Sequence, residues 1–144
     1  MSSALGAYFT SKEFEINGYY SRSFESAQHA AEYTKSTAYS KLEILLRDSN
    51  MIWITTPDDQ IEQVVKQILS LSVPDVNSKT ILHASGAHSL DVLEPLSLAG
   101  YNIAAAHPLM AFNNAESAVR RMPEVWFAIE DMPQSIISLE KFFA

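Results

Sequence analysis

Met51-Ile52-Trp53-Ile54-Thr55-Thr56-Pro57-Asp58-Asp59 is the stretch of sequence that decides the fold. Its first four residues are uniformly apolar, which is typical of a β-strand buried on both faces of a parallel sheet. Pro57 ends the strand, and apolar residues then recur at helical spacing over residues 61–69. A buried strand, a polar turn and an amphipathic helix form the repeating unit of an α/β protein.

Three further apolar runs end in short polar signatures. Residues 14–20 lead into Ser21-Arg22-Ser23, residues 80–82 into His83-Ala84-Ser85-Gly86, and residues 102–106 into His107-Pro108. Helical patterns lie between most of the runs, so the sequence predicts a parallel sheet. All carboxyl ends of such a sheet lie at one edge, where ligands bind. We therefore expect the four signatures to meet there.

The remaining pattern predicts one domain over residues 1–144, without repeats or linkers. Helices are expected at residues 2–9, after an N-cap at Ser23, from residue 42 to Asp48, and over 135–143. Asp58 or Asp59 is expected to cap the helix at 61–69, and Pro95 to interrupt a short helix around residues 90–96. Short strands are expected at 36–39 and 125–129.

Composition excludes several classes of function. The 144 residues carry a net charge of −7 and no basic patch, so nucleic-acid binding is not expected. The chain has no cysteine, which removes disulfides, thiolate metal sites and a cysteine nucleophile. It contains no apolar run of about 18 residues and no signal core, so we expect a cytoplasmic protein without a membrane span.

The order of the signatures resembles a known family, the Rossmann-like NADP oxidoreductases related to pyrroline-5-carboxylate reductase and the deazaflavin-dependent NADP reductases. The matching segments span residues 1 to about 130 and are Gly18–Ser23, Ile52–Ile61, His83–Ala87 and His107–Phe112. The resemblance implies a Rossmann-type three-layer α/β fold, a mostly parallel sheet with helices on both faces. It also implies NADP as cofactor, a small-molecule substrate and, for the full-length protein, a homodimer.

Two parts of the family pattern are missing. Members begin with a strand and a G-x-G-x-x-G turn, whereas Met1-Ser2-Ser3-Ala4-Leu5-Gly6 aligns with the end of that turn, so Ser2 replaces its third glycine. The first strand, which is central in the order 3-2-1-4-5-6, is absent, and so is the C-terminal helical domain. We therefore expect open edges on the neighbouring strands, weak cofactor binding and no activity of this chain alone. The natural protein is expected to be longer at both ends.

The resemblance assigns cofactor binding to the turns after the strands. Arg22 replaces the acid that binds the ribose of NAD and suits the phosphate of NADP, while Ser21 and Ser23 add donors. Thr55, Thr56, Pro57 and Asp58 would pass the adenosine ribose and the pyrophosphate. Ser85 and Gly86 would lie beside the nicotinamide. Each position also has a structural interpretation: Ser23 as an N-cap, Pro57 as a strand stop and Asp58 as a helix cap.

Three residues are candidates for catalysis. Ser85 could bind a substrate carbonyl or carboxylate, and His107 could act as a general acid. His83 is a weaker candidate, because a histidine within a strand is commonly a hydrogen-bonded core residue. His29 and His88 are expected at the surface. The histidines show no metal-ligand spacing, so no metal is expected.

The leading hypothesis is an NADP-dependent oxidoreductase domain that transfers hydride to or from a small imine, ketone or hydroxy acid. The alternative is a non-catalytic nucleotide sensor, or a protein-interaction module on a Rossmann fold. These hypotheses differ in whether the protein binds NADPH and whether it consumes it.

Overall fold

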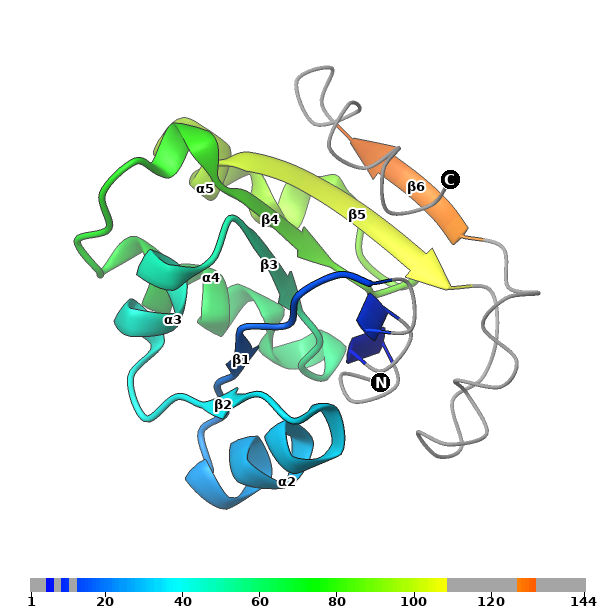
Figure 1. Ribbon diagram of the computed structural model, residues 1–144. Helices are drawn as coiled ribbons and strands as arrows, with labels where there is room; N and C mark the ends of the chain where they lie inside the picture. Colours follow the sequence, from blue (N-terminus) through cyan, green and yellow to red (C-terminus); the bar gives the residue numbers. More distant parts are fainter. Residues whose placement is uncertain (1–4, 7–8, 11–12, 109–126, 132–144) are drawn as a thin grey trace. The chain divides into compact units, whose positions relative to one another are not determined.

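The computed structural model describes residues 5–6, 9–10, 13–108 and 127–131 (Figure 1). The chain divides into two compact units. The first comprises Met1–Asp48 and Leu109–Trp126, and the second Ser49–Pro108 and Phe127–Ala144. Leu5, Gly6 and Phe9 are helical, as predicted, and Thr10 is helical as well. Ser2 and the helix predicted at 135–143 lie outside the described residues.

The first unit contains a parallel pair of very short strands. β1 (Gly18–Tyr19) pairs with β2 (Thr37–Ala38), with Gly18 opposite Thr37. The strand predicted over residues 14–20 is therefore reduced to two residues. β1 has β2 as its only paired strand among the described residues, so the sheet ladder cannot extend beyond this short partner. A Cβ atom on Gly18 would overlap the Thr37 carbonyl oxygen, so the close approach of the two strands requires glycine.

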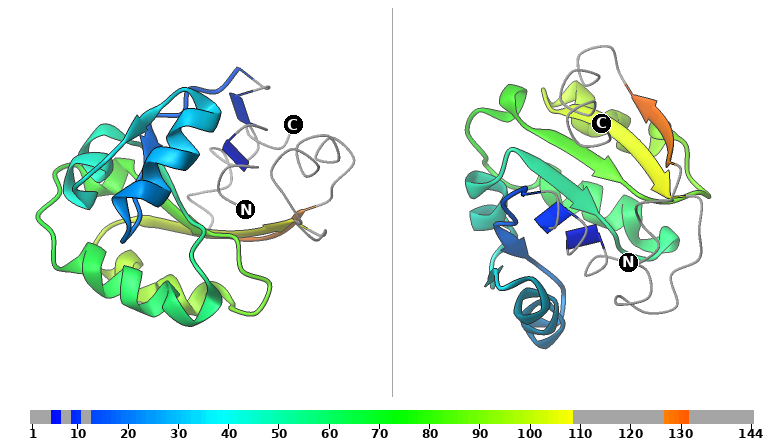
Figure 2. Two further views of the ribbon diagram at one scale, coloured as in Figure 1. Left: turned by 90° about the horizontal axis from the view of Figure 1, so that it is seen from below. Right: turned by 45° about the vertical axis from the view of Figure 1, so that its right-hand side comes forward.

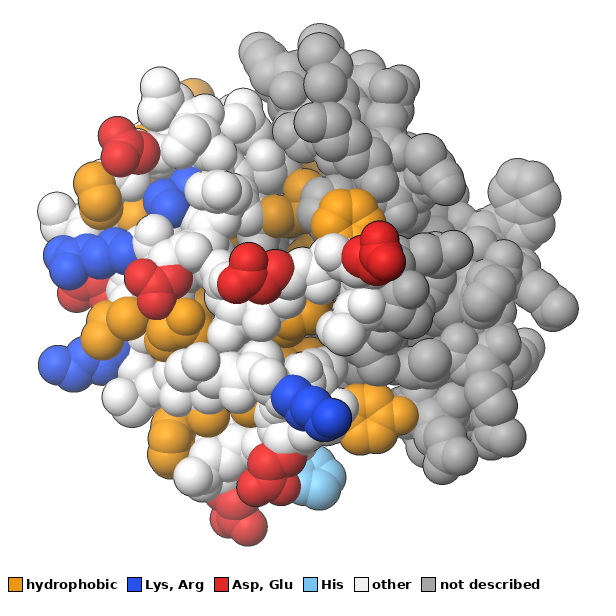
Figure 3. All heavy atoms as spheres, viewed as in Figure 1, with side chains coloured by type: hydrophobic (Ala, Val, Ile, Leu, Met, Phe, Trp, Pro, Cys, Tyr) orange, Lys and Arg blue, Asp and Glu red, His pale blue; other side chains and the backbone are white. Residues whose placement is uncertain are grey.

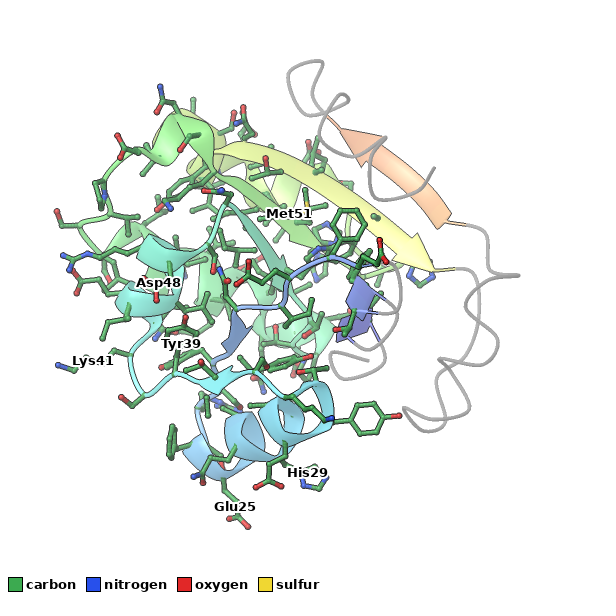
Figure 4. All side chains as sticks on the ribbon, viewed as in Figure 1. Glu25, His29, Tyr39, Lys41, Asp48 and Met51 are labelled. Atoms are coloured by element: carbon green, nitrogen blue, oxygen red, sulfur yellow. The ribbon has the colours of Figure 1, made fainter. Side chains whose placement is uncertain are left out.

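Two helices complete the first unit. α2 (Phe24–Thr34) begins at the predicted N-cap, where Ser23 Oγ accepts a hydrogen bond from the Ser26 amide at 3.4 Å, and it buries three alanines, Ala27, Ala30 and Ala31. α3 (Leu42–Asp48) buries three leucines, Leu42, Leu45 and Leu46. The Tyr39 hydroxyl, just after β2, donates to Asp48 Oδ2 at 2.9 Å and ties the end of α3 to this segment (Figure 4).

The second unit is built on a four-stranded sheet in the order β3-β4-β5-β6. β3 (Met51–Ile54), β4 (Thr80–His83) and β5 (Asn102–Pro108) are parallel, and β6 (Phe127–Asp131) is antiparallel to β5. β3 confirms the predicted range. β5 extends two residues beyond the run predicted at 102–106, because His107 and Pro108 still pair with β6. β6 lies two residues later than predicted.

Helices α4 (Ile61–Leu69) and α5 (Glu94–Leu98) both lie against one face of this sheet (Figure 2). They bury Ile61, Val65, Ile68 and Leu96. On the opposite face, Met51 and Trp53 pack against buried Leu82, Ala104 and Ala106. A short 3-10 turn precedes each of three elements: η1 (Asp58–Gln60) precedes α4, η2 (Val76–Ser78) precedes β4, and η3 (Leu90–Leu93) precedes α5. No helix within the described ranges is long and apolar enough to span a bilayer.

Two predictions about helix starts are wrong. Neither Asp58 nor Asp59 caps α4 with its side chain, because both lie inside η1, where the Gln60 amide already donates to the Pro57 carbonyl at 2.9 Å. Pro95 does not interrupt a helix. It lies in the first turn of α5, where its missing N–H would have had no intrahelical acceptor.

The described strands form two separate sheets, β1-β2 in the first unit and β3-β4-β5-β6 in the second. With parallel strands and intervening helices, the predicted α/β fold class is confirmed.

Candidate functional site

The carboxyl ends of β3, β4 and β5 lie together at one edge of the sheet. Their register places Ile54 opposite His83, and His83 opposite Ala105. The polar segments after β3 and β4 therefore begin at the same level, and His107 follows two residues beyond Ala105 on β5. Parallel strands thus bring three of the four predicted signatures together at this edge.

His83 is a fully buried ring with backbone partners on both nitrogens. Its Nδ1 accepts a hydrogen bond from the Ser85 amide at 3.1 Å, and its Nε2 lies 2.9 Å from the Ser89 carbonyl oxygen. Because a carbonyl oxygen only accepts, Nε2 carries the hydrogen and Nδ1 does not, so the ring is neutral. With both nitrogens occupied, the geometry favours a structural role over the proton transfer considered from sequence.

Ser85 organises the loop that follows β4. Its Oγ accepts hydrogen bonds from the amides of Ala87 at 3.1 Å and His88 at 3.3 Å. A serine oxygen has two acceptor lone pairs and one proton to donate. The hydroxyl proton has no acceptor among the described residues, and Ser85 is half-buried. This side chain can therefore donate to a ligand.

His107 projects from β5 toward the same loop. Its Nδ1 lies 2.9 Å from the Ala84 carbonyl oxygen, so Nδ1 donates and Nε2 is left without a partner in the described part of the chain. The ring lies against the backbone of Gly86, where an added Cβ atom would be 2.7 Å from Nε2. The half-buried ring of His107 thus has one nitrogen able to exchange a proton.

His88 is the residue that sequence reasoning missed. It was predicted at the surface, where it is half-buried, and its Nε2 lies 2.8 Å from the Asp58 carbonyl oxygen, a contact that was not predicted. It joins the loop after β4 to the turn after β3. The sequence signal that could have identified His88 is its position three residues after Ser85. At that position its amide donates to Ser85 Oγ and completes the turn. His29 is exposed on α2, as predicted (Figure 4).

Comparison with known proteins gives the family. The Rossmann-like domain family matches residues 1–108. The chain belongs to this family. A crystal structure of a "putative NADP oxidoreductase" from Bacteroides fragilis has the same fold, with a TM-score of 0.70 and 19% sequence identity. The alignment covers 89% of this chain but 46% of the other, so the chain spans less than half of that protein. None of the curated proteins matches it.

The family confirms the predicted Rossmann-type fold, while the likeness to pyrroline-5-carboxylate reductase and to deazaflavin-dependent reductases stays a prediction. Within this Rossmann-like domain, the four cofactor residues predicted after β3 differ in their exposure. Thr55 is half-buried, and Thr56, Pro57 and Asp58 are exposed on the turn after β3. Their proposed contacts with a nucleotide stay predictions.

The remaining cofactor residues belong to the first unit of the Rossmann-like domain. Ser21 is half-buried, Arg22 is exposed, and Ser23 is the N-cap of α2. Their convergence with the edge of the second unit stays a prediction. On the face shown in Figure 3, basic side chains are interspersed with acidic ones.

Proposed function

We propose that this domain binds NADP and serves an oxidoreductase that transfers hydride to or from a small imine, ketone or hydroxy acid. One observation carries the proposal: the Ser85 loop and His107 meet at the carboxyl edge of a parallel sheet. There, the Ser85 hydroxyl proton and His107 Nε2 are left unused by the described residues. This edge is where open α/β sheets bind their ligands.

Two of the candidate residues, one in each unit, have properties that suit a dinucleotide. Gly86 is exposed, and because it has no side chain the loop backbone lies directly against the ring of His107, so that the loop and this ring can face a ligand together. The exposed Arg22 is suited to the extra phosphate that distinguishes NADP from NAD, because its planar guanidinium matches phosphate oxygens. When bound, the reduced cofactor would supply the hydride.

The protein side chains would supply orientation and a proton. Reduction of a carbonyl or imine needs a proton on the oxygen or nitrogen as well as a hydride on carbon. His107 can hold that proton at Nε2, since its Nδ1 already donates to the Ala84 carbonyl. Ser85 can donate to the oxygen of the substrate and hold it near the loop.

The proposal is tested by titrating the 144-residue chain with NADPH. Because weak binding is expected, ligand-observed NMR is used to detect it. We expect NADPH to bind and NADH to bind more weakly. Absence of binding by both nucleotides at millimolar concentration would contradict it. Consumption of NADPH with a small ketone or imine, by the protein that carries this domain, separates the enzyme from a non-catalytic nucleotide sensor.

A further inference from the structure

The loop from Ala84 to Ser89 is held by a buried ring at its base. His83 is completely shielded from solvent, and its two nitrogens bind the first and last parts of the loop. The Ser85 amide donates to Nδ1 at 3.1 Å, and Nε2 donates to the Ser89 carbonyl at 2.9 Å. One side chain therefore fixes the separation between Ser85 and Ser89.

The hydrogen bonds of Ser85 determine what its hydroxyl can do. The amide is used by His83, and the two lone pairs of Oγ accept the amides of Ala87 and His88. Only the hydroxyl proton is left, so Ser85 can act toward a ligand as a donor alone. The complementary ligand atom is an acceptor oxygen, as in a carboxylate, a carbonyl or an amide.

The residues that lie opposite His83 on the adjacent strands are compatible with a neutral ring. On β3 and β5 the residues opposite it are Ile54 and Ala105, neither of which carries a charge. The ring of His88 lies 6.4 Å away, edge to face, and its Nε2 is engaged by the Asp58 carbonyl.

We infer that His83 is the positioning residue of this site: its neutral ring fixes Ser85 so that the hydroxyl donates to an acceptor oxygen of the bound ligand. The inference rests on the proposed function in one respect, that a nucleotide or substrate binds at this loop. His83 itself does not touch the ligand, because its ring is buried beneath the loop.

The first test uses the unaltered chain. Nitrogen-15 NMR of the imidazole rings distinguishes a bare from a protonated nitrogen. We expect His83 with hydrogen on Nε2 and none on Nδ1 at neutral pH, and slow exchange of the Ser85 amide. A ring protonated on Nδ1, or on both nitrogens, would overturn the inference whether or not any nucleotide binds.

The second test separates the two hydrogen bonds of the ring. In His83→Asn, the amide oxygen takes the place of Nδ1 and can still accept from Ser85. In His83→Gln, the amide nitrogen takes the place of Nε2 and can still donate to Ser89. Each variant loses one buried hydrogen bond, so both should lose similar stability, whereas only the glutamine variant releases Ser85.

We expect NADPH affinity to fall about threefold to tenfold more in His83→Gln than in His83→Asn, as for loss of one neutral hydrogen bond. Ser85→Ala should lose a similar factor, and His29→Asn on exposed α2 is the control that should lose none. Equal losses in the two His83 variants, in proportion to their stability, would make His83 purely structural and reject the inference. If the unaltered chain binds no NADPH, the proposed function fails, and ring protonation still decides whether His83 fixes Ser85.

Discussion

Gly86 lies so close to the imidazole of His107 that any side chain at this position would collide with the ring. An added Cβ atom would stand 2.7 Å from Nε2 and 2.9 Å from both Cδ2 and Cε1. The ring cannot easily withdraw, because its Nδ1 is held by the Ala84 carbonyl at 2.9 Å. The contact therefore links β5 to the loop after β4 and places Nε2 against the backbone of Gly86.

Gly86→Ala tests this contact. We expect a loss of about 1–3 kcal/mol in the free energy of unfolding, as for overpacking at a close contact, measured by denaturant unfolding. His107→Ala removes the ring, so the same glycine substitution should cost less in that background. Ala87→Ser at the exposed neighbouring position is the control. Equal costs of Gly86→Ala with and without the ring would show that the contact does not limit this position.

Arg22→Asp tests the phosphate assignment. The substitution replaces a cation suited to the extra phosphate of NADPH by a carboxylate that repels it. We expect NADPH affinity to fall about tenfold to a hundredfold, as for loss of a hydrogen bond to a charged group, and NADH affinity to change little. Lys41→Asp makes the same change of charge at another exposed position of the first unit. Equal losses for the two nucleotides would remove the assignment.

Ser23 has two predicted roles, and two substitutions separate them. Ser23→Ala removes the side chain that caps α2 and should cost about 1 kcal/mol of stability. Ser23→Asp keeps a capping oxygen but adds a negative charge beside the proposed phosphate site, so stability should hold while NADPH affinity falls. Thermal unfolding and nucleotide titration measure the two effects. Unchanged NADPH affinity in Ser23→Asp would leave Ser23 as a helix cap alone.

The strands of the second unit were predictable because burial determines their sequence. Met51–Ile54 is uniformly apolar, with Ile52 and Ile54 buried and the other two residues half-buried, and the ends of such strands locate the site. β1 was predicted too long, since strand length depends on a partner, and β2 provides only two residues.

The hydrogen bonding of the site was beyond sequence reasoning. Ser85 and His107 were recognisable from their places after strands, but which nitrogen of each histidine is free depends on carbonyl groups of residues distant along the chain. His107 meets Ala84 across 23 residues, and His88 meets Asp58 across 30. Such contacts produce no local pattern, which explains why the bond of His88 to Asp58 was not predicted and why His83 was considered for catalysis.

Tyr19 provides a test of stability at high pH. Its hydroxyl is buried without a hydrogen-bond partner among the described residues, and Thr34 beside it bonds instead to Ala30 and Ser36. Burial is the largest effect on the Tyr19 hydroxyl and raises its pKa above the ordinary value, against a smaller opposite effect of the neighbouring Thr34 side chain. The folded state therefore holds this proton more tightly than the unfolded state. The stability that depends on it is complete below about pH 10 and is lost as the pH rises further.

Tyr19→Phe removes both the unpartnered hydroxyl and the ionisation. We expect the free energy of unfolding to rise by about 1 kcal/mol at neutral pH, because a buried group without a partner is eliminated. The loss of stability above about pH 10 should also become shallower. Denaturant unfolding over a range of pH measures both effects, with Tyr33→Phe as the control, since Tyr33 is 47% exposed. A less stable Tyr19→Phe variant with an unchanged alkaline transition would show that the Tyr19 hydroxyl is stabilising and that folding does not raise its pKa.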